Sequence, residues 1–435
     1  MAVRSHASDV KHGARTEEII ARDKKVGTPS ATREYDFSFA RGKGCYVWDA
    51  DGKKYLDFAA GIAVLSAGHA NPEINAAVKR QLDHGSHCGF YDFYAEVPVA
   101  FEEKLVSLMP HGLDKVFLTN SGTETVEAAY KLARRHSGRM LTVAFEKCFH
   151  GRTMGSLSMT CSKSVQRDGF GPFLPVHHIP YPYFYRSGFS SPEECSDACL
   201  QIADSFFRHH DEDIAAMFVE PIQGEGGYIV PPKGFLAGLK KLCSEHGIIF
   251  VADEVQTGCY RTGTFLACEQ FGVKPDIVCL AKAIGGGFPI GAMVSTREIM
   301  DWPPGAHANT FGGNLVSCAA GLANLSFLEK KKAGENAAKL GKILLERLNE
   351  MKETHKIIGD VRGMGLMAGI EMVRNGNEKT PARKEVATLL ELCKDSGLLL
   401  LPAGQSVVRF CPPLIIKKEQ LLHGLDIIEK CLGKL

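Results

Sequence analysis

The feature that most constrains the fold is an alternation, between about residues 70 and 300, of short apolar runs with amphipathic helical patterns. Short apolar runs separated by helical segments are typical of a mostly parallel β-sheet that helices cover. One intervening helix is clear, because Phe235, Leu239 and Leu242 fall on one face and Gly247 ends the pattern. The predicted strands are Lys115–Thr119, Met140–Phe145, Ile214–Val219, Ile248–Ala252, Ile277–Leu280 and Ala292–Ser295.

The two ends of the chain differ from this central pattern. A short helix near Glu17–Lys25 and a hairpin around the turn Asp49–Gly52 precede the sheet. After about residue 315 a long helical pattern, Ser317–Lys331, leads into a smaller set of segments that mixes strands and helices. These segments are Gly359–Met372, Ala382–Ser396, Leu398–Leu401, Val407–Cys411 and Glu419–Leu432.

The composition argues against several classes of function. The chain carries 51 Lys and Arg against 50 Asp and Glu, so neither nucleic acid nor an acidic membrane is an expected partner. The first 15 residues are polar and lack the apolar core of a signal peptide, and no run approaches the roughly 20 apolar residues of a membrane span. The 14 cysteines are scattered, mostly in apolar segments, which predicts buried, reduced thiols in a cytoplasmic protein and no zinc site.

Chemically competent side chains follow the predicted strands at their carboxyl ends, where open α/β sheets bind ligands. After the first strand, Ser121-Gly122-Thr123 opens a helix and offers free backbone N–H groups, hydroxyls and the positive end of the helix dipole, which suits a phosphate. The same residues fit a plain helix N-cap equally well. There is no Walker pattern and no GxGxxG motif after a strand, so sites for ATP and dinucleotides are not predicted.

Two further strands end in an acid and in a lysine. Asp253 and Glu254 follow the run Ile248–Ala252, where buried carboxylates need partners, and no histidine stands at the spacing of a metal site. Lys282 follows Ile277–Leu280 and precedes three glycines. A lysine held at this edge of the sheet is a candidate nucleophilic amine.

Together these residues fit one cofactor. Pyridoxal phosphate needs an amine that forms an imine, a carboxylate beside the pyridine nitrogen, and a cup for its phosphate. Lys282, Asp253 and Ser121–Thr123 supply these three groups. We therefore predict a pyridoxal-phosphate enzyme in which Lys282 holds the cofactor as a Schiff base.

Six motifs along the chain resemble those of the class III aminotransferases, a group of the fold-type I pyridoxal-phosphate superfamily that contains 4-aminobutyrate, ornithine and N-acetylornithine aminotransferases. The resemblance covers nearly the whole chain. It implies an α/β fold with a large, mostly parallel sheet domain over residues 66–315 and a smaller α+β domain built from both chain ends, residues 1–65 and 316–435. The motifs are Asn120–Glu124, Phe149–Thr153, Glu220–Gly227, Asp253–Gly258, Lys282 with Gly285–Gly287, and Thr310–Asn314.

The resemblance implies a role for each residue around the cofactor ring. Lys282 would form the Schiff base and then move a proton between the substrate carbon and the cofactor. Asp253 would pair with the pyridinium nitrogen. Val255 and Phe149 would lie on opposite faces of the ring, and Gln256 would approach its hydroxyl group.

The resemblance also implies a homodimer with shared sites. Ser121–Thr123 would hold the phosphate together with Thr310 from the other subunit, and Asn309 would lie beside Thr310 in the substrate pocket. The sequence departs from the family here, because relatives often have Gly and then Ser or Thr where this chain has Ala308 and Asn309.

Four residues would select the substrate. Arg152 would bind a substrate carboxylate, and Arg409 would bind the α-carboxylate of glutamate or 2-oxoglutarate. Glu225 would pair with Arg409 when a substrate lacks that carboxylate, and Ile62 would line the pocket. Plainer alternatives stay open, since Arg152 could pair with a surface acid and Arg409, on a half-buried strand, could form a structural salt bridge.

The predicted function is amino transfer from an amino acid, with an ω-amine such as 4-aminobutyrate, ornithine or N-acetylornithine as the expected donor, to 2-oxoglutarate. The alternative is a racemase or epimerase on the same scaffold, because some relatives racemise and others decarboxylate. A third hypothesis is a non-catalytic regulator. It would need a DNA-binding arm, and the N-terminal stretch is too short for one. A requirement for a keto acid separates the first two.

Overall fold

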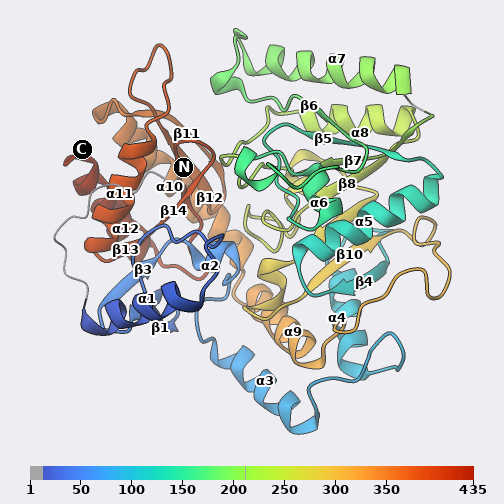
Figure 1. Ribbon diagram of the computed structural model, residues 1–435, viewed down its shortest axis with the longest axis horizontal. Coiled ribbons are helices and arrows are strands. Elements are labelled where there is room, and N and C mark those ends of the chain that lie inside the picture. The colour runs from blue at the N-terminus through green and yellow to red at the C-terminus, as the bar shows by residue number, and fades with distance from the viewer. Residues whose placement is uncertain (1–12, 211) are drawn as a thin grey trace.

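The computed structural model describes residues 13–210 and 212–435. Within these residues the strands form one seven-stranded sheet and two four-stranded sheets. Figure 1 shows the large sheet and its helices on the right and the strands β3 and β11 to β14, from the two ends of the described chain, on the left. Residues 1–12, most of the polar stretch that predicts the absence of a signal peptide, lie outside the described residues.

The seven-stranded sheet has the order β4-β10-β9-β8-β7-β5-β6. Strand β10 is antiparallel to β4 and to β9, and the remaining neighbours pair in parallel, which confirms the mostly parallel α/β fold. The inner strands are apolar throughout because helices cover the sheet, so that every residue of β7 is buried. The strands are β4 (Lys115–Thr119), β5 (Leu141–Phe145), β6 (Val176–Ile179), β7 (Ile214–Val219), β8 (Ile249–Asp253), β9 (Ile277–Leu280) and β10 (Gly291–Ser295).

Amphipathic helices pack on this sheet, α5 against β9 and β10, and α8 against β8. Among the described residues, no helix combines the length and the apolar character needed to cross a membrane. The helices of this part are α3 (Pro72–His84), α4 (Glu96–Ser107), α5 (Gly122–Ser137), α6 (Met154–Met159), α7 (Pro192–His210), α8 (Phe235–Glu245) and α9 (Leu315–Lys330). Short 3-10 turns are η1 (Ser164–Gln166), η2 (Phe184–Arg186), η3 (Ala267–Phe271) and η4 (Lys282–Gly285).

The two ends of the chain meet in one sheet of order β1-β2-β3-β13, where β13 pairs in parallel with β3 and Leu398 lies opposite Leu56. The third sheet has the order β11-β12-β15-β14. The domain boundaries near residues 65 and 315 stay predictions. The strands are β1 (Phe39–Lys43), β2 (Tyr46–Asp49), β3 (Lys54–Asp57), β11 (Ile358–Met364), β12 (Met367–Met372), β13 (Leu398–Leu399), β14 (Leu401–Ala403) and β15 (Val407–Phe410). The helices are α1 (Ala14–Val26), α2 (Ala60–Ala63), α10 (Ala333–Thr354), α11 (Arg383–Asp395) and α12 (Lys418–Leu432).

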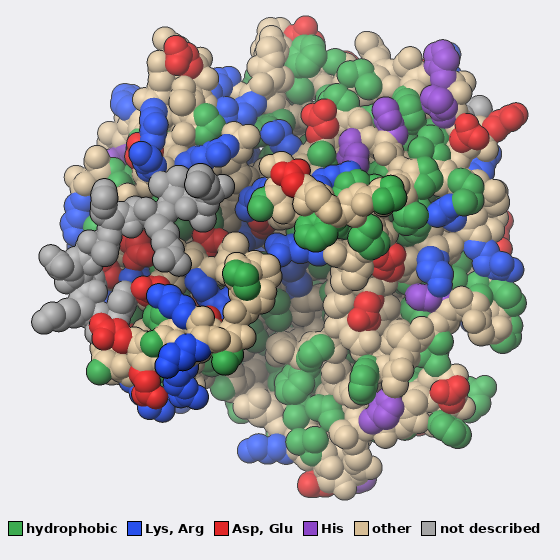
Figure 2. All heavy atoms as spheres, in the orientation of Figure 1, with side chains coloured by type: hydrophobic (Ala, Val, Ile, Leu, Met, Phe, Trp, Pro, Cys, Tyr) green, Lys and Arg blue, Asp and Glu red, His purple; other side chains and the backbone are tan. Residues whose placement is uncertain are grey.

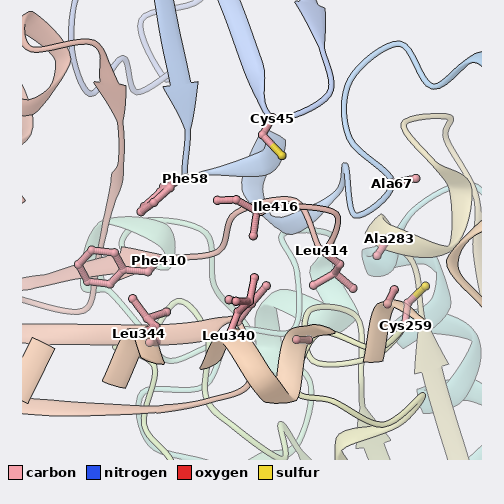
Figure 3. Packing of buried hydrophobic residues seen from close by; sticks show 14 of the residues in the cluster. Cys45, Phe58, Ala67, Cys259, Ala283, Leu340, Leu344, Phe410, Leu414 and Ile416 are labelled. Carbon is pink, nitrogen blue, oxygen red and sulfur yellow. The ribbon is translucent and has the colours of Figure 1, made fainter. Parts of the chain in front are cut away.

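Apolar residues from both chain ends pack into one core. Figure 3 shows Phe58, which follows β3, between Phe410 and Ile416 from the C-terminal part, with Leu340 and Leu344 of α10 on the other side of the cluster. All five side chains are almost fully buried. Burial of this kind stabilises a fold by about 25 cal/mol per Å² of apolar surface, so the N-terminal segment is held to the C-terminal helices by the hydrophobic effect.

Helix α2 is a left-handed turn. Ala60, Gly61, Ile62 and Ala63 have φ values of 46°, 60°, 66° and 59°, a region that costs about 1–2 kcal/mol for each residue with a side chain. Cys411 holds the start of this turn, because its backbone N–H donates to the carbonyl of Phe58 at 2.9 Å and its thiol to that of Ala59 at 3.3 Å. The residue after the turn, Val64, reaches the cavity described below.

Gly341 of α10 packs directly on the turn between β11 and β12. A Cβ at this position would lie 2.3 Å from the backbone oxygen of Gly365, which cannot move without shifting that turn. The substitution Gly341→Ala is therefore expected to lower the free energy of unfolding by about 1–3 kcal/mol in urea titrations. Gly376→Ala is the matched control, since no atom lies within 4 Å of its added Cβ. An equal change in both variants would contradict the packing argument.

Candidate active site

A cavity of about 500 Å³ lies at the carboxyl edge of the seven-stranded sheet. Apart from Val64, its walls come from residues at or after the ends of β4, β5, β7, β8 and β9, five strands that run in the same direction. The volume suits a small-molecule site. The lining residues are Val64, Asn120, Ser121, Gly122, Thr123, Phe149, His150, Gly151, Arg152, Glu220, Asp253, Val255, Gln256, Ala281, Lys282, Gly287, Phe288, Pro289 and Ile290.

Asp253 is the last residue of β8, and its side chain is 5% exposed. One carboxylate oxygen accepts the backbone N–H of Val255 at 3.1 Å, and the other lies 2.7 Å from Nδ1 of His150, which is itself buried. Burial opposes a positive charge on His150, but Cys148 and Asp253 beside it raise the pKa of its imidazole well above the usual value. The site therefore contains a buried carboxylate that is held in place on both oxygens.

Lys282 begins η4 directly after β9. Its φ is 45°, in the left-handed region, a strain of about 1–3 kcal/mol of the kind that gathers at functional sites. Burial lowers the pKa of Lys282 below the ordinary lysine value, although the carboxylates of Asp253 and Glu220 oppose that effect. A lowered pKa raises the fraction of neutral amine, the form that acts as a nucleophile and as a base.

Glu220 follows β7 and lines the same cavity. Its two carboxylate oxygens accept the backbone N–H groups of Phe149 at 2.8 Å and Gly224 at 2.9 Å. Burial raises the pKa of Glu220 to about 7. This side chain therefore ties the loop that carries Phe149 to the glycine-rich turn that carries Glu225.

Helix α5 begins at Gly122, and Ser121 is its N-cap, because the Ser121 hydroxyl accepts the N–H of Glu124 at 3.3 Å. This cap leaves the backbone N–H groups of Gly122 and Thr123 without an acceptor among the described residues. A Cβ on Gly122 would lie 2.8 Å from Val255, so the close approach needs glycine. The N-cap and the anion cup are thus compatible, since one oxygen caps the helix while other donors stay free.

A second group of charged side chains includes Arg409, from the sheet β11-β12-β15-β14. Arg409, on β15, donates from Nη1 to one oxygen of Glu225 at 3.3 Å, and Nζ of Lys163 lies 2.6 Å from the other oxygen. Arg152 is exposed, lines the cavity, lies 5.7 Å from the centre of the Phe149 ring, and has no acidic partner among the described residues. Figure 2 shows lysine and arginine side chains along a hollow between the two parts of the molecule.

The structure brings most of the predicted residues into one cavity but leaves five outside its lining. Ile62 is 47% exposed, and Val64 lines the cavity in its neighbourhood. Thr310 is exposed, and Asn309 donates to the carbonyl of Leu118 at 3.1 Å. The other two are Glu225 and Arg409.

Among the lining residues that received no role from the sequence, two are buried ionisable side chains, His150 and Glu220. Glu220 carries the same signal as Asp253, an acid that ends a buried strand, and His150 lies within one of the six motifs.

Comparison with known proteins gives the family. The family model described as Aminotransferase class-III matches residues 29–432. The chain belongs to the class III aminotransferases. A probable 4-aminobutyrate aminotransferase from Bacillus subtilis (strain 168) is 38% identical over 398 residues, which cover 89% of this chain and 91% of the relative. A leucine/methionine racemase from Thermococcus litoralis is 37% identical over 424 residues, which cover 96% of each chain.

Among solved structures, the ornithine aminotransferase from Toxoplasma gondii superposes with a TM-score of 0.86 at 30% identity, covering 96% of this chain and 94% of that one. Its crystals contain pyridoxal phosphate at partial occupancy in the active site.

Class III aminotransferases depend on pyridoxal 5′-phosphate, and the cavity fits that cofactor. The free N–H groups at the start of α5 suit its phosphate, and the anchored carboxylate of Asp253 suits a protonated ring nitrogen. In addition, Oε1 of Gln256 is buried and has no hydrogen-bond partner among the described residues, so it can accept from a ring hydroxyl.

Replacing Lys282 by alanine is expected to lower aminotransferase turnover by at least about a thousandfold, because the same side chain is predicted to supply both the amine that holds the cofactor and the group that moves the proton. The variant should still bind pyridoxal phosphate non-covalently, since the start of α5 and Asp253 remain. Absorbance spectra and dialysis distinguish bound from covalently held cofactor. Covalent attachment to another lysine in this variant would contradict the assignment.

Proposed function

We propose that this aminotransferase moves the amino group of an ω-amino acid, such as 4-aminobutyrate, ornithine or N-acetylornithine, to 2-oxoglutarate. The observation that carries the proposal is the pairing of Arg409 with Glu225 beside the cavity. An arginine that pairs with an acid of its own chain suits an enzyme that binds two kinds of substrate in turn. One kind is a dicarboxylate, and the other is an amine that has no carboxylate next to its reacting carbon. The names of the B. subtilis and T. gondii relatives support this substrate class.

In this proposal Lys282 would hold the cofactor through its amine, and Asp253 would pair with its pyridine nitrogen. His150 donates to Asp253 and fixes the orientation of the carboxylate. When bound, pyridoxal phosphate supplies the carbon that takes up the amino group and a ring that delocalises the electron pair left on the substrate carbon. The other proposed contacts are Ser121, Gly122 and Thr123 at the phosphate, Val255 and Phe149 at the ring faces, and Gln256 at the ring hydroxyl.

Lys282 also moves the proton. With substrate bound, the Nζ atom of Lys282 would be the group that holds or gives up a proton at the substrate carbon. Because burial lowers its pKa, a larger fraction of this amine is neutral, and the neutral amine could take the proton from that carbon and return it during the same turnover. The single lysine therefore serves both as the anchor and as the general acid–base group.

Substrate choice follows from Arg409 and Glu225. Glutamate and 2-oxoglutarate bring a carboxylate next to the reacting carbon, which Arg409 binds while Arg152 receives the distal carboxylate. An ω-amine brings none there, and an unpaired guanidinium that is 6% exposed would cost several kcal/mol. Glu225 removes this cost by staying with the arginine.

A racemase is the second candidate, because the T. litoralis relative carries that name. Both activities use a lysine to move the proton, so the cavity itself fits either. Transamination requires a keto acid and racemisation does not. Incubation with single L-amino acids without keto acid, followed by chiral chromatography, separates the two.

Substitutions of Arg409 and of Glu225 are each expected to slow mainly one half-reaction, and the half-reaction differs between the two. Arg409→Ala should slow the half-reaction with 2-oxoglutarate by roughly a hundredfold and the ω-amine half-reaction far less, because a close charge pair is worth several kcal/mol. Glu225→Ala should slow the ω-amine half-reaction more. Single-turnover absorbance measurements on each half-reaction test this. Arg297→Ala, at an arginine with a 77% exposed side chain, is the control. Equal slowing of both halves by both variants would make the pair a structural salt bridge.

The homodimer is also a proposal. It is supported by Thr310, which is exposed and does not line the cavity of its own subunit, and by three exposed aromatic residues, Phe93, Tyr94 and Phe311. Obligate interfaces of this kind bury more than ~2,000 Å². A cytoplasmic location is supported in turn by the cysteines, because all 14 lie in the described part of the chain as free thiols.

Sedimentation is expected to give twice the chain mass of 47.4 kDa for the active enzyme. Phe311→Lys should shift it toward an inactive monomer, because a charge would be buried in the interface without a partner. Ile202→Lys, at a similarly exposed apolar residue of α7, is the matched control. A fully active monomer of the unmodified chain would refute the shared site.

A further inference from the structure

Glu225 lies between two cations. Its Oε2 atom is 3.3 Å from Nη1 of Arg409, and its Oε1 atom is 2.6 Å from Nζ of Lys163. Arg409 is a buried residue of the small sheet, whereas Lys163 belongs to the segment between α6 and β6 and its side chain is 37% exposed. The contact with Lys163 is the shorter one. Because Arg409 and Lys163 belong to different parts of the fold, Glu225 is shared between these parts.

Glu225 cannot be left unpaired at low cost. Its side chain is 20% exposed, and burial would raise its pKa, but Arg409 and Lys163 lower the pKa of this carboxyl below the usual value. The carboxylate is therefore the form that the site holds. When a substrate carboxylate takes Arg409, Glu225 loses one of its two partners, and Lys163 is the partner that remains.

Lys163 is fixed well enough to be that partner. It precedes η1, and four residues later Arg167 donates to backbone carbonyl oxygens at the end of α6, which anchors the segment. The backbone of Glu225 is fixed as well, because its carbonyl accepts the N–H of Gly404 at 2.8 Å. Glu225 can therefore give up Arg409 and stay with Lys163 by no more than a rotation of its side chain.

We infer that Lys163 is a specificity-determining residue, which receives Glu225 when Arg409 binds the carboxylate of a dicarboxylate oxo acid. The inference rests on the proposed function and adds a third member to the Glu225–Arg409 pair. Without Lys163, Arg409 is the one residue left in an ion pair with Glu225 among the described residues. Glu225 would then compete with the substrate for the arginine.

Two consequences distinguish this role from a structural one. Loss of Lys163 should weaken binding of a dicarboxylate, because the competition inside the site becomes stronger, and should leave the ω-amine half-reaction nearly unchanged. Loss of Glu225 should instead affect the ω-amine half-reaction more than the binding of a dicarboxylate. In addition, loss of Lys163 should have no effect once Glu225 is absent, because Lys163 acts through Glu225 and not on the substrate.

The test uses the cofactor-loaded enzyme and glutarate, an unreactive dicarboxylate of the length of 2-oxoglutarate. Calorimetry should give a Kd for glutarate that is roughly tenfold higher in Lys163→Met, with a matching rise in KM for 2-oxoglutarate and kcat within about twofold. Lys163→Arg, which keeps the charge, should restore binding. Lys339→Met, at an exposed lysine of α10, is the control, and thermal unfolding checks that each variant is folded.

The double variant Lys163→Met with Glu225→Ala decides the matter, since its Kd for glutarate should equal that of Glu225→Ala alone. An unchanged Kd in Lys163→Met, or a loss that persists in the Glu225→Ala background, overturns the inference while the proposed function stands. If the unmodified enzyme neither binds glutarate nor reacts with 2-oxoglutarate, the proposed function itself fails, and the inference fails with it.

Discussion

The buried carboxylate of Asp253 is the constraint on which the rest of the site depends. A charge that ends a central strand must be compensated, and here the partners are an imidazole from the loop after β5 and a backbone N–H of its own loop. Because β5, β7, β8 and β9 run in parallel, residues that follow them are placed side by side although they are far apart in sequence. Strand direction, more than any single contact, determines that Lys282 shares a cavity with Asp253.

The fold could be predicted where burial on both faces leaves an uninterrupted apolar run. The run Ile214–Val219 coincides with β7 for this reason, whereas β6, Val176–Ile179, was not predicted, because two histidines interrupt its apolar pattern. Helix α10 was also not predicted. Leu340 and Leu344 carry a usable helical spacing there, but the preceding lysine run resembles the solvated end of one helix. The sequence therefore reports burial directly and the arrangement of separate elements poorly.

The site residues show the same difference between what the sequence reveals and what only the folded chain shows. Lys282 and Asp253 could be recognised because each stands where an apolar run stops, a position that is visible in the sequence. Lys163 could not, since it lies in a polar segment without periodicity and meets Glu225 only after the chain has folded around α6 and β7. A partner that is 62 residues away leaves no local pattern. The charges that we propose tune substrate choice are therefore a property of tertiary structure.

The left-handed turn at Ala60–Ala63 has a consequence for the timing of synthesis. One wall of the cavity, at Val64, adjoins a strained segment whose start is held by Cys411, 352 residues after Ala59. At ribosomal rates of ~5–20 residues per second, the turn waits on the order of 20–70 s for this partner. All strands of the large sheet have been synthesised before then, because β10 ends at Ser295. Nascent chains thus contain the sheet edge with Asp253 and Lys282 before the opposite wall is secured, and the finished cavity arises only as translation ends.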